Sequence, residues 1–275
     1  MQGRIFLLHY GEESAERLII KHRKIYGDIF IMNIGYLTDR GRRRPSNEDA
    51  VRVVEDLKFF MLADGVGGNR SGEIASESAL EALEKFLRHN PQEPLTSREE
   101  IFRYFRAAVN YVNHCIIKLS ESQPQYAGMA TTLAFAYIRD GVLYVANVGD
   151  SRVYLIHDDI IQQITDDHTY VNDLVKMGAI SKEEAHMHSR KNVITRAIGA
   201  NANNEPDCFS VPLKKGDRIL LCSDGLYDEV EDETILSLVN RFDDMRICAE
   251  DLVALANENG GNDNISVICV DMTEE

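Results

Sequence analysis

Segments with helical periodicity occur in pairs along this chain, and strand-like segments lie between the pairs. In each helical segment apolar residues recur every three or four positions, as expected for a helix with one buried face. One helix opens with overlapping capping signatures, Thr96-x-x-Glu99 and Ser97-x-x-Glu100. Paired helices between groups of strands favour sheet layers covered by helices over a parallel sheet of alternating strands and helices. The segments are residues 74–87 and 101–119 in one pair, and 235–239 and 249–256 in the other.

Short segments rich in β-branched or aromatic residues, bounded by turn residues, are typical of strands. Asp140-Gly141 joins two of them and is a strong hairpin signal. We therefore expect most neighbouring strands to pair antiparallel. The predicted strands are residues 50–54, 59–63, 131–138, 142–148, 152–156, 218–222 and 265–270.

Composition indicates an ordinary folded protein, with 44% hydrophobic and 27% charged residues in 275. No apolar run approaches the roughly 18 residues of a membrane-spanning helix, and residues 5–8 are too short for the apolar region of a signal peptide. We expect a cytoplasmic protein. The five cysteines are odd in number and lack C-x-x-C spacing, so buried thiols in a reducing compartment explain them better than disulfides or a zinc site.

Residues 1–31 differ from the rest of the chain. Glu12, Glu13 and Glu16 precede a basic run at residues 21–24, with apolar residues between them. This pattern fits a short amphipathic helix that acts as a docking or regulatory arm, or a disordered terminus preceding a true start near Met32. We predict an N-terminal extension over 1–31, a catalytic domain over 32–275, and no loss of catalysis when the extension is deleted.

The formal net charge of −15 argues against binding to nucleic acid or to an anionic membrane, because both reward clustered Lys and Arg. It leaves two interpretations of the excess carboxylates. They are either scattered over a solvated surface, or some of them converge on cations that reverse the local sign of the charge.

Several acidic residues share one position, at the edge of a predicted strand beside a glycine or asparagine. Any one of these pairs could be ordinary turn chemistry, and Asp150 could merely close a hairpin. Asp64-Gly65 fits a hairpin turn poorly, because the following residues lead into a helix. Strand ends are where a rigid scaffold can aim side chains into a shared cleft. The sites are Asn47-Glu48-Asp49, Asp64-Gly65, Gly149-Asp150, Asp224-Gly225 and Asn262-Asp263-Asn264.

This acidic pattern matches the ligand preference of hard divalent cations. Mg²⁺ and Mn²⁺ take oxygen ligands, usually with one or two carboxylates per ion, and keep several waters. The histidines offer no site of similar quality, since His186-x-His188 lies in a polar stretch without further ligands nearby. The sequence therefore predicts a Mn²⁺ or Mg²⁺ centre at the sheet edges.

Six motifs between residues 44 and 264 resemble, in order, those of the type 2C metal-dependent protein phosphatases, and those of the bacterial Ser/Thr phosphatases most of all. The match covers roughly residue 32 to the end of the sequence. The ordered set is far more specific than any single motif. The motifs are Arg44-Pro45-Ser46-Asn47-Glu48-Asp49, Ala63-Asp64-Gly65-Val66-Gly67-Gly68 with Ser71-Gly72-Glu73, Met129-Ala130-Thr131-Thr132, Val148-Gly149-Asp150-Ser151-Arg152, Cys222-Ser223-Asp224-Gly225-Leu226 and Gly261-Asn262-Asp263-Asn264.

The resemblance implies an α+β fold in which two antiparallel β-sheets pack as a β-sandwich, flanked on both sides by antiparallel helix pairs. It also implies a site with two or three Mn²⁺ or Mg²⁺ ions. Asp64 resembles the carboxylate that bridges two metals, with the Gly65 carbonyl on one ion. Asp224 and Asp263 resemble direct ligands of the other ion.

The remaining site residues follow from the same resemblance. Glu48 and Asp49 would act mainly through metal-bound waters, and Asp150 resembles a ligand of a third, weaker metal. Arg44 resembles the arginine that binds the substrate phosphate; alternatively, it is a surface member of the basic run 40–44. Residues 166–192 resemble the family's flap beside the active site, or form a surface helical insertion.

The implied activity is hydrolysis of phosphoserine and phosphothreonine in phosphoprotein substrates, by direct attack of a water activated between two metals. A partner Ser/Thr kinase is implied in the same way, and a phosphatase devoted to one regulator is compatible with the motifs.

Some family members carry a histidine after the Asp-Gly pair as a general acid, where this chain has Val66. A metal-bound water or another side chain must then supply that proton. Asn69 replaces a histidine found in many bacterial relatives.

The alternative to an enzyme is a phosphatase-like regulatory module that binds phosphoproteins or metal without turnover.

Overall fold

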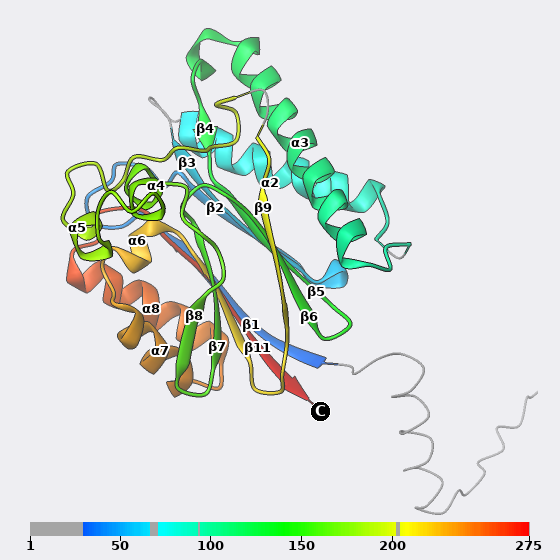
Figure 1. Cartoon of the computed structure of the whole chain (residues 1–275), viewed down its shortest axis with the longest axis vertical. Coiled ribbons are helices and arrows are strands. Elements are labelled where there is room, and N and C mark those ends of the chain that lie inside the picture. The colour runs from blue at the N-terminus through cyan, green and yellow to red at the C-terminus, as the bar shows by residue number, and fades with distance from the viewer. Residues whose placement is uncertain (1–29, 67–70, 93, 202–203, 275) are drawn as a thin grey trace, which may run out of the picture.

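A computed structural model of the chain describes residues 30–66, 71–92, 94–201 and 204–274. Two sheets pack face to face, and every strand pairing in these residues is antiparallel. Helices α2 (Ser71–His89) and α3 (Arg98–Ser122) cover one side of the sandwich, and α7 (Asp232–Arg241) and α8 (Met245–Asn259) cover the other (Figure 1). The α+β sandwich between helix pairs is therefore confirmed.

The five-stranded sheet joins the two ends of the described chain. Its strand order is β1-β11-β10-β7-β8, and Phe30 at the start of β1 lies opposite Glu274 at the end of β11. Its strands are β1 (Phe30–Asp39), β7 (Arg152–His157), β8 (Ile160–Gln163), β10 (Arg218–Cys222) and β11 (Ile265–Glu274).

The six-stranded sheet has the order β2-β3-β5-β6-β9, and the short β4 pairs with the end of β3. The predicted hairpin at Asp140-Gly141 joins β5 to β6, and Gly141 takes the left-handed φ of 71° that this tight turn needs. The strands are β2 (Asp49–Val54), β3 (Phe59–Val66), β4 (Ala130–Thr131), β5 (Leu133–Arg139), β6 (Val142–Val148) and β9 (Asp207–Pro212).

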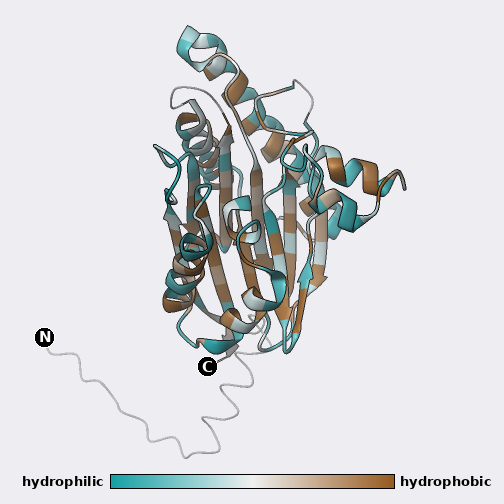
Figure 2. Cartoon of the chain, turned by 90° about the vertical axis from the view of Figure 1, so that its left-hand side faces the viewer, coloured by the Kyte–Doolittle hydropathy of each residue, from teal (hydrophilic) through white to brown (hydrophobic). Residues whose placement is uncertain are grey.

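Three layers of buried apolar residues hold the fold together. One lies between α2, α3 and the six-stranded sheet and includes Phe59, Phe105 and Phe135. A second lies between the two sheets, and a third lies between α7, α8 and the five-stranded sheet. Figure 2 shows the corresponding pattern, with hydrophobic residues along the strands and mixed faces on the helices. Because each sheet is covered on both faces, its central strands are apolar on both sides.

All four predicted helices are present and extend two to four residues beyond the predicted segments, and the cap of α3 and the end of α8 lie where the sequence predicts. The α3 helix starts after Ser97, whose hydroxyl accepts from the Glu100 N–H at 3.3 Å, while Glu100 accepts from the Ser97 N–H at 3.0 Å. This is the reciprocal capping box. Gly260 follows the last residue of α8. None of the helices that the structure describes combines the length and hydrophobicity needed to cross a bilayer.

The remaining short elements are the 3-10 helices η1 (Glu55–Leu57) and η2 (Pro124–Tyr126) and the helices α4 (Tyr170–Lys176), α5 (Lys182–His186) and α6 (Asp224–Tyr227). Helices α4 and α5 form a surface insertion within the segment predicted as a flap, here defined as residues 166–192. The helix predicted within residues 1–31 lies outside the described residues. The first strand begins at Phe30, two positions before the predicted domain start.

Candidate metal centre and active site

Two predicted acidic residues face each other at one edge of the six-stranded sheet. In the pairing of β2 with β3, Asp49 lies opposite Asp64. The backbone of Asp64 is fixed on both sides, because its N–H donates to the Thr132 hydroxyl at 2.8 Å and its carbonyl accepts from the Thr132 N–H at 2.8 Å. Its carboxylate is thus held by a rigid strand end while remaining available as a ligand.

Close backbone packing explains the glycines of the second motif. The Gly65 N–H donates to the Glu48 carbonyl at 3.0 Å. A Cβ at Gly65 would lie 2.1 Å from the Gly72 carbonyl oxygen, and a Cβ at Gly72 would lie 2.1 Å from the Glu48 carboxylate. Only glycine fits at these contacts. The start of α2 therefore packs directly against Glu48. Residues Gly67, Gly68 and Asn69 lie outside the described residues.

The other sheet contributes Asp224, the first residue of α6, and Asp263, which precedes β11. The Ser223 hydroxyl donates to an Asp49 carboxylate oxygen at 2.8 Å and so links the two sheets. Asn264 makes a second link, because its side-chain oxygen accepts from the Glu48 N–H at 2.8 Å. Strand ends from opposite sheets therefore converge at one place.

Arg44 lies directly over this convergence. Its guanidinium contacts the Asp263 carboxylate at 2.5 Å. Burial lowers the pKa of Arg44, but the hydrogen bond and negative charge of Asp263, together with the charges of Asp224 and Asp64, outweigh burial and raise that pKa. The guanidinium therefore stays charged beside the carboxylates, as a phosphate-binding group requires.

Asp150 lies at a crossing between the sheets. Strand β6 belongs to one sheet and β7 to the other, so residues 149–151 do not close a hairpin. The hairpin alternative for Asp150 was therefore wrong. The Asp150 side chain is buried, and the Tyr227 hydroxyl donates to its backbone carbonyl at 3.0 Å.

The carboxylates are close enough to repel one another. Burial, followed by the charges of Asp49, Asp224, Asp150 and Asp263, raises the pKa of Asp64 well above its ordinary value. Burial likewise raises the pKa of Asp49 to about 6 and that of Asp150 to about 7. Without a compensating cation, this group of acids is unfavourable in its charged form.

Among the described residues, two buried carboxylate oxygens, one on Asp49 and one on Asp224, have no hydrogen-bond partner. Buried polar atoms are normally paired, so such orphaned oxygens call for an explanation. Within the described residues, no three His, Cys, Asp or Glu side chains already lie in the arrangement of a formed metal site. The oxygen-only donor set, the mutual repulsion and the orphaned oxygens nevertheless fit hard divalent cations such as Mn²⁺ or Mg²⁺.

The structure adds a set of flap-anchoring residues that the sequence analysis missed. Arg152 contacts the Asp167 carboxylate through two nitrogens, at 2.7 and 3.1 Å, and its guanidinium lies 3.5 Å from the centre of the Tyr227 ring. The backbone N–H of Gly149 donates to the ring nitrogen Nδ1 of His168 at 3.0 Å, and the backbone N–H of His168 donates to the Gly149 carbonyl at 3.0 Å. The base of the flap is thus fastened to the residues on both sides of Asp150.

A signal for the anchors was present, because Arg152 closes one of the quoted motifs and Thr169 is an N-cap residue for α4. The contact from Gly149 to His168 has no counterpart in local sequence. The Asp207 carboxylate in β9 lies 3.0 Å from His168 Nε2 and accepts a hydrogen bond from the Arg196 guanidinium at 2.9 Å. These contacts tie the flap base to a third segment.

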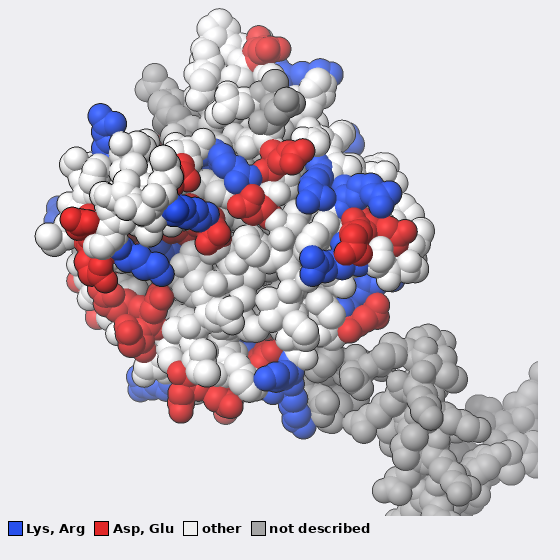
Figure 3. Space-filling view, viewed as in Figure 1, with Lys and Arg blue, Asp and Glu red and all other residues white. Residues whose placement is uncertain are grey.

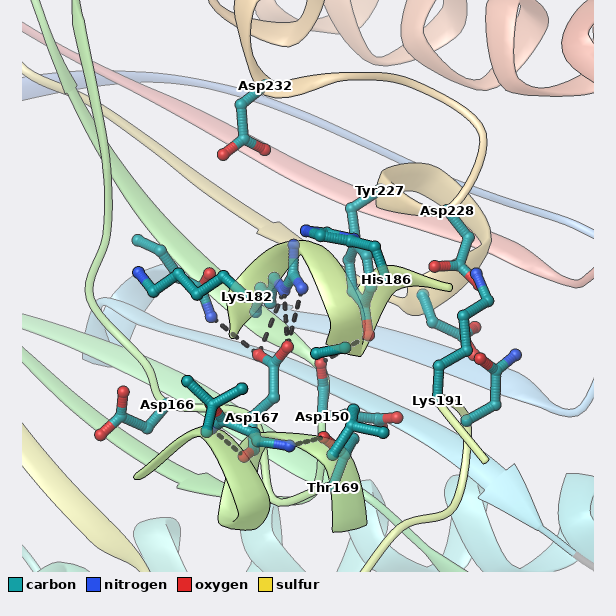
Figure 4. A pocket seen from close by; sticks show the side chains of 18 of the residues that line it. Asp150, Asp166, Asp167, Thr169, Lys182, His186, Lys191, Tyr227, Asp228 and Asp232 are labelled. Atoms are coloured by element: carbon teal, nitrogen blue, oxygen red, sulfur yellow. Dashed lines mark hydrogen bonds and ion pairs between the residues drawn. The ribbon is translucent and has the colours of Figure 1, made fainter. Parts of the chain in front are cut away.

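A cavity of about 550 Å³ lies between the flap and this centre. Figure 4 shows Asp150 and Tyr227 next to each other in its lining, and Asp167 held nearby by its hydrogen bonds. Lys191 bridges the cavity mouth by an ion pair of 3.0 Å to Asp228. His186 also lines the cavity, while its neighbour His188 does not. The predicted flap therefore borders a cleft that reaches Asp150 and Asp224.

Comparison with known proteins agrees with this geometry. The family described as Protein phosphatase 2C matches residues 40–258. A serine/threonine phosphatase stp of Listeria innocua is 38% identical over 243 residues, which cover 87% of this chain and 96% of that protein. The protein phosphatase PhpP of Streptococcus pneumoniae is 37% identical over 247 residues, which cover 89% and 99%.

Solved structures are similar over the same extent. The Mycobacterium tuberculosis serine/threonine phosphatase PstP/Ppp matches with a TM-score of 0.81 and 37% identity, covering 88% of this chain and 99% of that one. The catalytic domain of PstP in complex with two manganese ions matches with a TM-score of 0.78 and 36% identity, covering 89% and 100%.

Proposed function

Because the chain belongs to the protein phosphatase 2C family, we propose that it is a metal-dependent protein serine/threonine phosphatase acting on phosphoserine and phosphothreonine in phosphoprotein substrates. The observation that carries this proposal is the convergence of Asp49, Asp64, Asp150, Asp224 and Asp263, each of which raises the pKa of Asp64 or has its own pKa raised there. In a structural ion-pair network, most of these acids would pair with cationic side chains. Here Arg44 forms an ion pair with one of them, Asp263.

We assign Mn²⁺ or Mg²⁺ as the cofactor, with two ions at the main site. Asp64 and the Gly65 carbonyl would hold one side of the pair, and Asp224 and Asp263 the other. Glu48 and Asp49 would act through bound waters. For Asp49, such a water would give its buried, unpaired oxygen a hydrogen-bond partner. Asp150 would hold a third ion at the cavity floor. The PstP catalytic domain, which contains two manganese ions, supports the number of ions.

When bound, such ions supply a water of lowered pKa that can attack phosphorus. The residues of this chain bind and orient the substrate phosphate and shield the site from solvent. Arg44 offers two guanidinium nitrogens to phosphate oxygens, and Asp263 fixes its direction at 2.5 Å. No cysteine nucleophile is needed, and burial raises the pKa of the Cys222 thiol, which opposes formation of a thiolate. The flap over the cavity limits solvent and selects substrates.

The same proposal extends to organisation and partners. Residues 32–275 form the catalytic domain and residues 1–31 an extension that catalysis does not need. The substrates are those of a Ser/Thr kinase in the cytoplasm, and neither nucleic acid nor membrane is a partner. The net charge of −15 supports the last point.

Turnover of a phosphothreonine peptide with Mn²⁺ and with EDTA tests the proposal. We expect phosphate release with Mn²⁺, none in chelator, and recovery when Mn²⁺ is returned. Equal rates in both conditions would rule out a metal-dependent mechanism. Absence of turnover under all conditions, with retained binding of the peptide, would favour the regulatory module instead.

A further inference from the structure

Three exposed arginines precede the phosphate-binding arginine in a chain that is strongly acidic overall. Arg40, Arg42, Arg43 and Arg44 are all exposed, and the formal net charge is −15. Among the described residues, Arg44 pairs with Asp263, while the side chains of Arg40, Arg42 and Arg43 have no ion pair or hydrogen bond. We call residues 40–43 the arginine loop. Three cations beside the centre that have no ion pair either bind an anionic partner or stay hydrated.

Backbone contacts hold the arginine loop rigidly against the segment that carries Asp263. The N–H groups of Arg42 and Arg43 donate to the Gly261 carbonyl at 2.8 and 3.1 Å. Asn264 donates its side-chain N–H to the Arg40 carbonyl at 2.8 Å. Because these contacts use main-chain atoms of the loop, the arginine side chains are left free.

Gly41 explains why the loop can approach so closely. Its φ of 75° is left-handed, and a Cβ there would lie 2.0 Å from the Asp263 carbonyl oxygen. Its N–H donates to the Asp39 carboxylate at 2.8 Å, which closes the turn. The loop is therefore built in contact with a residue of the catalytic centre, at a fixed position relative to it.

Resting on the proposed phosphatase function, we propose that the arginine loop binds a second phosphate group on the same substrate segment, so that doubly phosphorylated sequences are preferred substrates. A phosphate at neutral pH carries about −1.5 to −2 charges and three acceptor oxygens. Guanidinium groups bind such oxygens in pairs. Three free guanidinium groups match one phosphate better than a single carboxylate with one charge.

The length of the loop agrees with this occupant. An extended peptide advances about 3.3 to 3.6 Å per residue, so a phosphorylated residue two to four positions from the one at Arg44 lies roughly 7 to 14 Å away. Adjacent Cα atoms lie about 3.8 Å apart and residues 41–43 form a turn, so the Cα atoms of Arg40, Arg42 and Arg43 all lie within about 15 Å of that of Arg44. Both phosphates can then be held at once.

The cavity beside the centre is more acidic and would repel a second phosphate. The cavity under the flap is lined by Asp228, Glu231, Asp232 and Glu233. Its cations are fewer, and of these Arg152 and Lys191 already pair with Asp167 and Asp228, which leaves Lys182. Figure 3 shows acidic side chains gathered below the flap, over the part of the molecule where α7 and α8 lie in Figure 1. An anionic neighbour of the reacting residue is therefore favoured on the side of the arginine loop.

The test uses three peptides of one sequence, with a single phosphothreonine, with a second phosphothreonine three residues away, and with aspartate at that second position. The full-length chain is compared with the triple variant Arg40→Gln, Arg42→Gln, Arg43→Gln. The matched control removes three exposed cations of α2 and α3, as Lys85→Gln, Arg103→Gln, Arg106→Gln. The backbone contacts of the loop survive these substitutions.

We expect the triple variant to lose about tenfold in kcat/KM for the doubly phosphorylated peptide, with less than about threefold change for the other two peptides and for p-nitrophenyl phosphate. The control variant should match the parent. Equal loss for all peptides, no loss for any of them, or an equal loss for the aspartate peptide would each overturn the proposal.

Binding separates this proposal from the proposed catalysis. In an Asp224→Asn background, fluorescence anisotropy measures the ratio of affinities for the doubly and singly phosphorylated peptides without turnover. The ratio should fall about tenfold when the loop arginines are replaced. An unchanged ratio would overturn the role of the loop, whereas a parent chain that binds with this ratio but never releases phosphate would overturn only the proposed function.

Discussion

The carboxylate centre and the flap are built in opposite ways, although they border the same cavity. Asp64 sits at the end of a central strand, and its surroundings leave no room even for a methyl group at Gly65 or Gly72. The flap consists of two short helices with Met177 and Met187 exposed at 79% and 89%. It is fastened mainly at its base. The difference suggests that the catalytic positions are fixed by the sheets, while substrate access depends on a few anchors.

The strongest test of the rigid region is Asp224→Asn. The change keeps the shape of the side chain but removes a charge, so we expect catalysis to fall by more than the roughly 100-fold typical for partners outside the ligand shell. Because burial and repulsion raise the pKa of Asp224, the metal-free variant should melt no lower than the parent. Phosphopeptide turnover and thermal melting in EDTA measure both effects. Asp228→Asn, in the same cavity wall, is the control and should retain most activity.

Removing metal should affect the centre more than any other part of the fold. At a free Mn²⁺ concentration 100 times the dissociation constant, binding stabilises the folded state by about 2.7 kcal/mol. We therefore expect the melting temperature to fall on the order of 5 °C in EDTA and to recover with Mn²⁺. Calorimetry with and without chelator checks this. A melting temperature that ignores Mn²⁺ would mean that the carboxylates do not bind it.

Arg152→Lys tests whether the flap depends on its anchor. Lysine keeps the charge but loses the paired contacts to Asp167 and the stacking on Tyr227. We expect the opening free energy of residues 166–192 to drop by about 1–3 kcal/mol, while the central strands stay protected. Hydrogen exchange followed by mass spectrometry separates the two regions. Equal loss in flap and strands would show that Arg152 supports the whole fold.

A smaller effect is expected from pH. Burial lowers the pKa of His168 below its ordinary value of 6.5, against the opposing hydrogen bond to Asp207, so the anchored state binds fewer protons than the open one. Its contribution is present above pH 6.5 and is lost as pH falls through the lowered pKa, by at most about 1.4 kcal/mol per pH unit. Arg196 and Lys176, which also face His168, act in the same direction.

Limited proteolysis within residues 166–192 at pH 7.5 and pH 5.5 measures this dependence. His168→Asn retains an acceptor for the Gly149 N–H but does not titrate in this range, so its cleavage should change less with pH than that of the parent. If both proteins respond equally to acid, another group controls the flap.

Sequence reasoning succeeded where local pattern and buried position coincide. The central strands were predicted because they are apolar on both faces, and β6 and β10 have the predicted bounds. The strands β1, β8 and β9 were missed. All three lie at sheet edges, where partly exposed residues blur the alternation.

The candidate site shows the same limit. Its acidic residues were predicted because each stands beside a strand end, and the structure brings them together. The link from Gly149 to His168 and the crossing of the chain between sheets at Asp150 depend on tertiary contacts that no local pattern encodes.

The pairing of β1 with β11 has a consequence for synthesis. Phe30 pairs opposite Glu274, so the first described strand has no neighbour in its sheet until β11 has been synthesised. Contacts so distant in sequence also slow folding. Asp263 lies just before β11, so one late segment of the domain completes both the sheet and the carboxylate centre. A chain that lacks β11 would therefore be inactive, so activity is delayed until this segment has been made.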